Sequence, residues 1–169
     1  MPMLNRQQAG QFLERIGFVQ RAQNVWIAQQ MVEGRLFIVE AFLKEAVVEI
    51  RIALNLFTRC NQTSVYRYFN EENTRIALGK FAIGPEVDHE GRLLFLSVEM
   101  PPGTEEEYIA EESLVLLIGL ALNLLKEHYT PIERLFRQGC EAPGEVHGER
   151  VRELLERMRV FGREEGGHA

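Results

Sequence analysis

The sequence predicts a single α+β domain in which helices pack on an antiparallel β-sheet. Three apolar runs, over 25–31, 36–43 and 47–57, alternate with a period of two residues, as strands do. The connections between them are too short for crossover helices, so neighbouring strands must run antiparallel. A segment over 104–128 then has the length of a helix, and its second half is apolar.

Size and charge limit what the chain can be. Its 169 residues fit one domain, and an apolar fraction of 46% indicates a buried core. The net charge of −6 disfavours direct binding to nucleic acid or to anionic membranes. The most apolar run, 114–125, is shorter than the roughly twenty residues that a membrane span needs. We therefore expect neither nucleic acid nor a membrane as a partner.

The cysteine content favours a reducing compartment. Cys60 and Cys140 are far apart in the sequence, and residues 1–6 lack the basic and then apolar pattern of an export signal. We expect two reduced thiols in a cytoplasm. Basic residues are mostly arginine, which suggests a GC-rich genome.

A helix and a meander open the domain. The helix is predicted over 5–16, with Asn5 as its N-cap and Gly17 as its stop. The three strands follow, and Glu33-Gly34 forms a tight turn between the first two. In the third strand, alternate residues over 48–56 face the core, and the opposite face is expected to be largely wet.

A short helix within 62–73 and a strand pair come next. The strands are predicted over 75–83 and 92–100, joined by a loop that is rich in turn-forming residues. Pro101-Pro102-Gly103 stops the second strand.

The long helix is predicted over 104–128. Thr104 followed by Glu107 matches a capping box, and Pro131 ends the helix, with a further turn possible through 132–136. The stretch 114–122 is apolar nearly all round, which is typical of a helix buried on most sides.

The C-terminal part divides from the main domain. The domain spans residues 4–138, and a Gly- and Pro-rich linker follows over 139–148. Residues 149–161 form an additional amphipathic helix, and 162–169 form a disordered tail.

No catalytic, cofactor or metal site is predicted. The four histidines are not spaced as metal ligands, and phosphate-binding glycine loops and nucleophile motifs are absent. Glu40 and Glu49 interrupt apolar strands, and the favoured interpretation is that both face solvent. In the alternative, they join Arg51 in a cleft between sheet and long helix, as in a small-molecule-binding or enzymatic domain.

Apolar residues exceed what one sheet face needs. The strand 36–43 is apolar on both faces except at Glu40, and only one face can pack on the long helix. The other face is therefore predicted to bind a partner or a second copy of the chain, unless the terminal helix folds over it. The predicted contact residues are Trp26, Phe37, Val39, Leu43 and Phe57.

Three stretches carry a family resemblance. They are the glycine-ended helix over 12–18, the Tyr68-Phe69-Asn70 helix leading into the strand around 79–82, and the segment 88–99 that leads through Pro-Pro-Gly into an acidic helix start. With the order of elements, residues 4–138 resemble the YbjN family and the wider group of type III secretion chaperone-like proteins, which includes the Tir chaperone type.

The resemblance implies a non-enzymatic role. Secretion chaperones of this type are homodimers that hold an extended client segment against apolar patches on the sheet, and YbjN-like proteins have regulatory or chaperone-like roles. Such folds carry no catalytic residues to transfer. We therefore expect a cytoplasmic, dimeric, chaperone-like or adaptor protein that binds a client or regulated protein and needs no cofactor.

Overall fold

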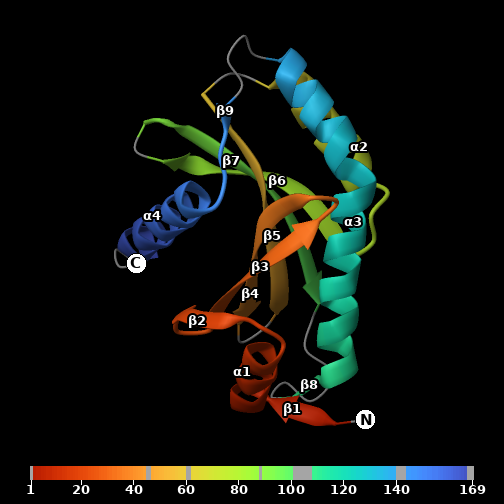
Figure 1. Ribbon diagram of the computed structural model, residues 1–169, viewed down its shortest axis with the longest axis vertical. Helices are drawn as coiled ribbons and strands as arrows, with labels where there is room; N and C mark the ends of the chain where they lie inside the picture. The colour runs from red at the N-terminus through yellow and green to blue at the C-terminus, as the bar shows by residue number, and fades with distance from the viewer. Residues whose placement is uncertain are drawn as a thin grey trace.

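A computed structural model describes residues 2–44, 47–59, 62–87, 89–100, 108–139 and 144–166, with the side chains at 108, 144 and 159–166 left out. A seven-stranded antiparallel sheet forms its centre, and helices lie on both faces (Figure 1). The main strand order is β2-β3-β4-β5-β7-β6, and β9 pairs with β5. The predicted α+β fold class is confirmed.

The opening helix, α1 (Arg6–Arg15), begins at the predicted N-cap. The Asn5 side chain accepts a hydrogen bond from Gln8 N at 2.8 Å, and Gln8 Oε1 accepts one from Asn5 N at 3.0 Å. This reciprocal pairing satisfies two backbone donors that the helix leaves open. Gly17 follows with a φ of 104°, a conformation in which glycine is unstrained.

The predicted meander is present as β3 (Val25–Val32), β4 (Arg35–Leu43) and β5 (Val48–Thr58). Glu33 and Gly34 form the tight turn between β3 and β4, with φ values of 49° and 78°. An additional edge strand, β2 (Val19–Ala22), pairs with β3. The sequence did not predict β2 because it is four residues long and half polar.

In the second half, α2 (Thr63–Asn73) leads to the hairpin of β6 (Gly79–Val87) and β7 (Gly91–Met100). Strand pairing continues to Val87 and Gly91, so the predicted loop between the strands is wrong over most of its length. The Asn73 amide donates to Phe81 O at 2.9 Å, and its Oδ1 accepts from Phe81 N at 2.7 Å. These two bonds fasten the end of α2 to the edge strand.

The long helix, α3 (Glu111–Gln138), differs from its prediction at both ends. The predicted start at 104 is wrong, because β8 (Tyr108–Ala110) is extended and pairs with β1 (Met3–Asn5); Thr104 and Glu107 lie outside the described residues. Pro131 does not end the helix. Ile132 and Phe136 beyond it are fully buried, and this burial offsets the one backbone hydrogen bond that proline lacks.

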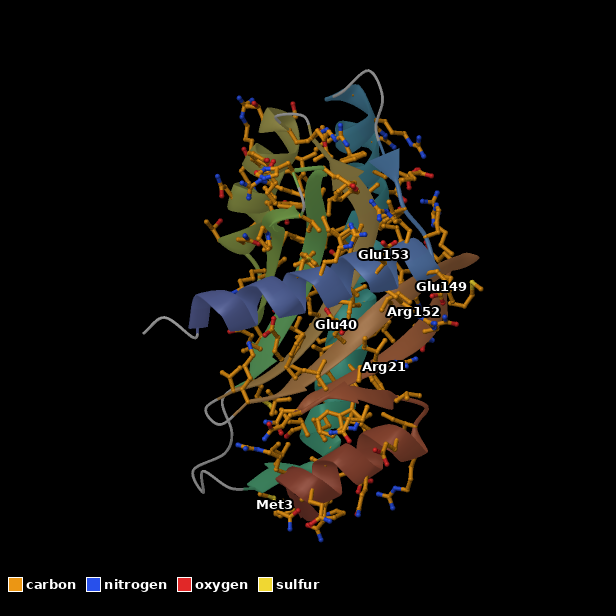
Figure 2. All side chains as sticks on the ribbon, turned by 90° about the vertical axis from the view of Figure 1, so that its left-hand side faces the viewer. Met3, Arg21, Glu40, Glu149, Arg152 and Glu153 are labelled. Atoms are coloured by element: carbon orange, nitrogen blue, oxygen red, sulfur yellow. The ribbon has the colours of Figure 1, made fainter. Side chains whose placement is uncertain are left out.

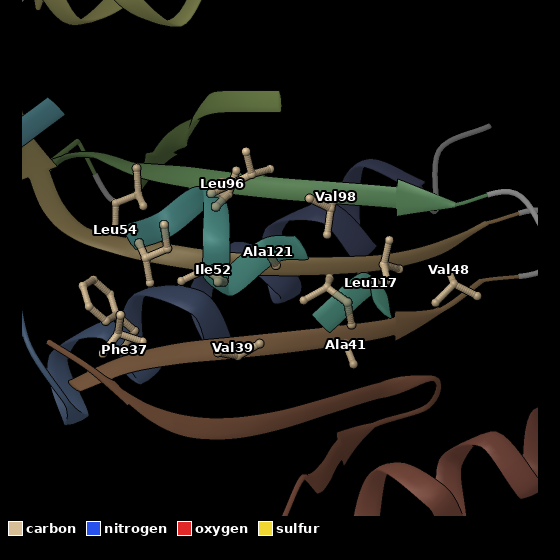
Figure 3. Packing of buried hydrophobic residues seen from close by; sticks show 14 of the residues in the cluster. Phe37, Val39, Ala41, Val48, Ile52, Leu54, Leu96, Val98, Leu117 and Ala121 are labelled. Atoms are coloured by element: carbon tan, nitrogen blue, oxygen red, sulfur yellow. The ribbon is translucent and has the colours of Figure 1, made fainter. Parts of the chain in front are cut away.

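Two apolar layers flank the sheet. The larger core joins α1, α2 and α3 to one face, where side chains of β4, β5 and β7 meet Leu117 and Ala121 of α3 (Figure 3). On the other face, β9 (Gly144–Glu145) leads into α4 (Glu149–Gly166). The helix continues beyond the predicted end at 161, and the predicted tail is helical through Gly166 because Arg163-Glu164-Glu165 are good helix formers.

Candidate functional site

The predicted contact residues do not form an open surface. Trp26, Phe37, Val39 and Leu43 are at most 5% exposed, in the core beneath the helices. The Phe37 ring packs edge-on against Tyr129 of α3, with centroids 5.2 Å apart. The expectation of an exposed apolar face at these positions is wrong, because this side of the strands is the side that α3 and α1 cover. Their role as contact residues stays a prediction.

The opposite sheet face is covered by α4, which crosses it in Figure 2. Val151, Leu154 and Leu155 of α4 are fully buried. Phe57 and Met158 flank this cluster. The three leucine and valine side chains pack on the apolar residues that point to this side of the strands: Ile27, Ile38, Ala53, Val87, Leu93 and Phe95. The terminal helix thus folds over an apolar sheet face, but over the face opposite to Trp26 and Phe37, whereas the alternative interpretation placed it over the face of those two residues.

A buried ion pair lies on this same face. Arg51 Nη2 and Nε donate hydrogen bonds to Glu40 Oε1 at 2.8 and 3.0 Å, between residues that face each other on β5 and β4. The guanidinium lies 4.7 Å from the ring centres of both Phe42 and Phe95. Glu40 is 1% exposed, so the expectation that it faces solvent is wrong.

Glu49 is also buried, and its surroundings keep it charged. Lys44 Nζ donates to Glu49 Oε2 at 2.6 Å, and Ser97 Oγ donates to Oε1 at 2.9 Å. Burial raises the pKa of Glu49, but these two hydrogen bonds and the charges of Lys44 and Arg51 together lower it by more, so the net pKa lies below its ordinary value. A general acid near neutral pH needs the opposite shift.

Two of the hollows that described residues line lie beside the sheet. The one between the sheet and α3, lined by Phe37, Leu125 and Tyr129, holds about 150 Å³, below the roughly 300 Å³ of small-molecule sites. Another of about 310 Å³ opens beside Ser97 and Lys80. Within the described part of the chain, no group of three or more potential metal ligands occurs.

Large apolar residues are exposed at Met3, Ile16, Val19, Met31 and Leu78, and two that are adjacent in the sequence, Val115 and Leu116, lie on α3. Leu116 is 71% exposed and Val115 is 52% exposed, and both precede Gly119, which faces open space. We call the exposed residues on this side the outer face of α3: Glu112, Val115, Leu116, Gly119, Asn123 and Lys126. The predicted burial of this helix on most sides is wrong here. The sheet covers one side, and α2 contacts a later turn of α3 through the hydrogen bond between Tyr68 and His128.

The outer face of α3 could have been found from the sequence. A helix that packs on one sheet buries a single stripe. Apolar residues on the opposite stripe of 114–122 therefore exceed what such packing requires, and the predicted burial on most sides is wrong because it takes the whole run as core.

Comparison with known proteins identifies the fold. No family model and no curated protein matches the sequence. Among solved structures, the chain is similar to the "Crystal structure of YbjN, a putative transcription regulator from E. coli", with a TM-score of 0.54 and 8% identity. The match covers 76% of this chain and 90% of that chain. The predicted YbjN-like fold is confirmed, and at this identity the likeness concerns the fold alone. No helix in the described ranges is long and apolar enough to span a membrane.

Proposed function

We propose that this protein is a non-enzymatic protein-binding module, a cytoplasmic chaperone-like or regulatory adaptor, and that it binds through the outer face of α3. One observation carries this proposal. Val115 and Leu116 are adjacent, more than half exposed, and lie on a 28-residue helix whose other side forms the main core. Neighbouring exposed apolar side chains of this kind are typical of partner surfaces.

The charged residues are consistent with the same choice. Exposed charged residues elsewhere are extensively paired, as in the contacts of Glu133 with Arg35 and Arg137. The buried carboxylates Glu40 and Glu49 are held by basic partners, as structural ion pairs are. The YbjN structure, described as a putative regulator, is consistent with a binding role.

The proposal is tested by capture from a native cell extract with tagged protein. Leu116→Glu is expected to abolish capture of a specific partner that the wild type retains. The matched control is Met31→Glu, which places the same charge at a 59% exposed methionine on β3. Far-ultraviolet circular dichroism should show that both variants keep the fold. Equal capture by wild type and Leu116→Glu would contradict the assigned surface.

A further inference from the structure

We propose that the outer face of α3 pairs with the same face of a second copy of this chain, in antiparallel orientation, with the two-fold axis at Gly119. The inference rests on the proposed function, because it names the partner of the surface assigned there.

The spacing of the outer face is symmetric about Gly119. Glu112 precedes Gly119 by seven residues, and Lys126 follows it by seven. Seven residues make nearly two helical turns, or about 10.5 Å, so all three lie on one stripe. In an antiparallel pair, residues equally far from the axis in opposite directions face each other.

The charges at the two ends of the stripe select this orientation. An antiparallel pair places Glu112 of each copy opposite Lys126 of the other, and it does so twice. A parallel pair would place like charges together, which is unfavourable. Within the described part of the chain, neither Glu112 nor Lys126 forms an ion pair, unlike many charged residues elsewhere on the surface. Both are exposed, and Lys126 also lines the hollow beside the β3–β4 turn.

The residues between the charges supply the contact. Leu116 of one copy lies level with Leu122 of the other, a half-buried residue at the edge of the outer face, and Val115 lies level with Asn123. At the centre, a Cβ added to Gly119 would meet no atom within 4 Å other than its chain neighbours and the nearby backbone of its own helix. A glycine at that point lets two helix backbones approach closely, which accounts for a residue that otherwise weakens the helix.

One seam of four turns is a small interface. Stable complexes bury roughly 800 Å² per partner, and weaker ones bury less. We therefore expect a dimer that dissociates at micromolar concentration, on the order of 1–100 μM.

Cross-linking tests the orientation. In a background with Cys60→Ser and Cys140→Ser, Gly119→Cys should be joined into dimers by a short bifunctional maleimide. Glu112→Cys alone should not be joined, because the two copies of residue 112 lie about 21 Å apart along the pair. In a mixture of the Glu112→Cys and Lys126→Cys variants, one copy of each variant should be joined into a dimer. Met31→Cys, exposed on β3, is the control for random collision. Linking of Glu112→Cys alone, or of Gly119→Cys no faster than Met31→Cys, would overturn the proposal.

A charge exchange tests the same contact in solution. Glu112→Lys and Lys126→Glu should each weaken self-association about tenfold at low salt, because each places like charges together in its own dimer. Their equal mixture should regain wild-type association, since both opposed pairs then carry opposite charges. Sedimentation equilibrium measures the three dissociation constants.

The two proposals fail in different ways. The pairing of two copies would be overturned by a wild type that stays monomeric at millimolar concentration. It would also be overturned if the mixture of Glu112→Lys and Lys126→Glu had a dissociation constant no lower than those of the two variants alone. If Leu116→Glu still loses a captured protein in that case, the surface binds a different partner and the proposed function stands. If Leu116→Glu changes neither measurement, both proposals fall.

Discussion

Two nitrogens of Arg51, Nε and Nη2, donate hydrogen bonds to the same oxygen of Glu40, Oε1, at 3.0 and 2.8 Å. The pair joins the central strands β4 and β5, and the aromatic rings of Phe42 and Phe95 flank the guanidinium. Water reaches Arg51 partly and Glu40 hardly at all, since their side chains are 22% and 1% exposed. Each charge therefore depends on the other for its stability in the interior.

Breaking this pair should be costly. Glu40→Ala removes the carboxylate and leaves Arg51 in a largely apolar setting, so the free energy of unfolding should fall by about 3–5 kcal/mol. Urea denaturation measures the loss. Lys80→Ala is the control, because its ion pair with Glu99 is largely exposed, at 56% and 40%, and should be worth less than about 1 kcal/mol. Equal losses in the two variants would contradict the structural role of the buried pair.

Glu49 should make stability depend on acid pH. Its folded-state pKa lies below the ordinary 4.5 because the bonds from Lys44 and Ser97 outweigh burial. A carboxyl with a lowered folded-state pKa stabilises the protein above its unfolded pKa, and this contribution is lost as the pH falls through the folded pKa. The difference in unfolding free energy between wild type and Glu49→Gln should therefore be large near neutral pH and shrink below about pH 4.5.

Urea titrations at about pH 7 and about pH 3.5 give that difference directly. The control is Glu99→Gln, which changes a more exposed carboxyl on the neighbouring strand and should alter the unfolding free energy less at both pH values. A difference for Glu49→Gln that stays constant across this range would contradict the assigned hydrogen bonds.

Alternation in the sequence predicted the strands but not what covers them. The period of two residues correctly placed Trp26, Phe37 and Val39 on one face of the sheet. It carried no information on which helix lies over that face, because this depends on the path of the chain between distant elements. The same limit applies to Glu40, whose partner Arg51 lies eleven residues away and opposes it only through the β4–β5 register.

Local signals were reliable where a residue acts on its own neighbours. Asn5 at the start of α1 and Glu33-Gly34 in the β3–β4 turn are examples. They failed at Pro131, where the burial of Ile132 and Phe136 against the sheet outweighs the local preference to end a helix. Tertiary packing decided the length of α3.

The contact of α4 with the sheet should contribute strongly to stability. Leu154 is fully buried between α4 and the apolar side chains of this face. Leu154→Ala should lower the unfolding free energy by about 2–5 kcal/mol, as large-to-small changes in cores do. Glu149→Ala on the same helix, at an 87% exposed side chain, should cost less than about 1 kcal/mol. Similar losses for both would show that α4 is not anchored as described.

Two glycines in helices should respond oppositely to alanine. A Cβ at Gly10 would lie 2.5 Å from Cζ2 of Trp26, so Gly10→Ala forces α1 away from the sheet and should destabilise the fold by about 1–3 kcal/mol. Trp26 is the only tryptophan, so its fluorescence emission should shift to the red as water gains access to the ring. If this variant keeps both the fluorescence emission maximum and the unfolding midpoint of the wild type, the packing of α1 on Trp26 would be contradicted.

Gly119→Ala should strengthen the monomer and weaken the pair of copies. Nothing in the chain opposes a methyl group at this position, and alanine favours a helix over glycine by about 1 kcal/mol. Thermal unfolding at low micromolar concentration should therefore show a higher midpoint than the wild type. The same methyl group would separate two helices that cross at Gly119, so the dissociation constant should rise severalfold. A variant that is more stable and equally dimeric would place the crossing point elsewhere on α3.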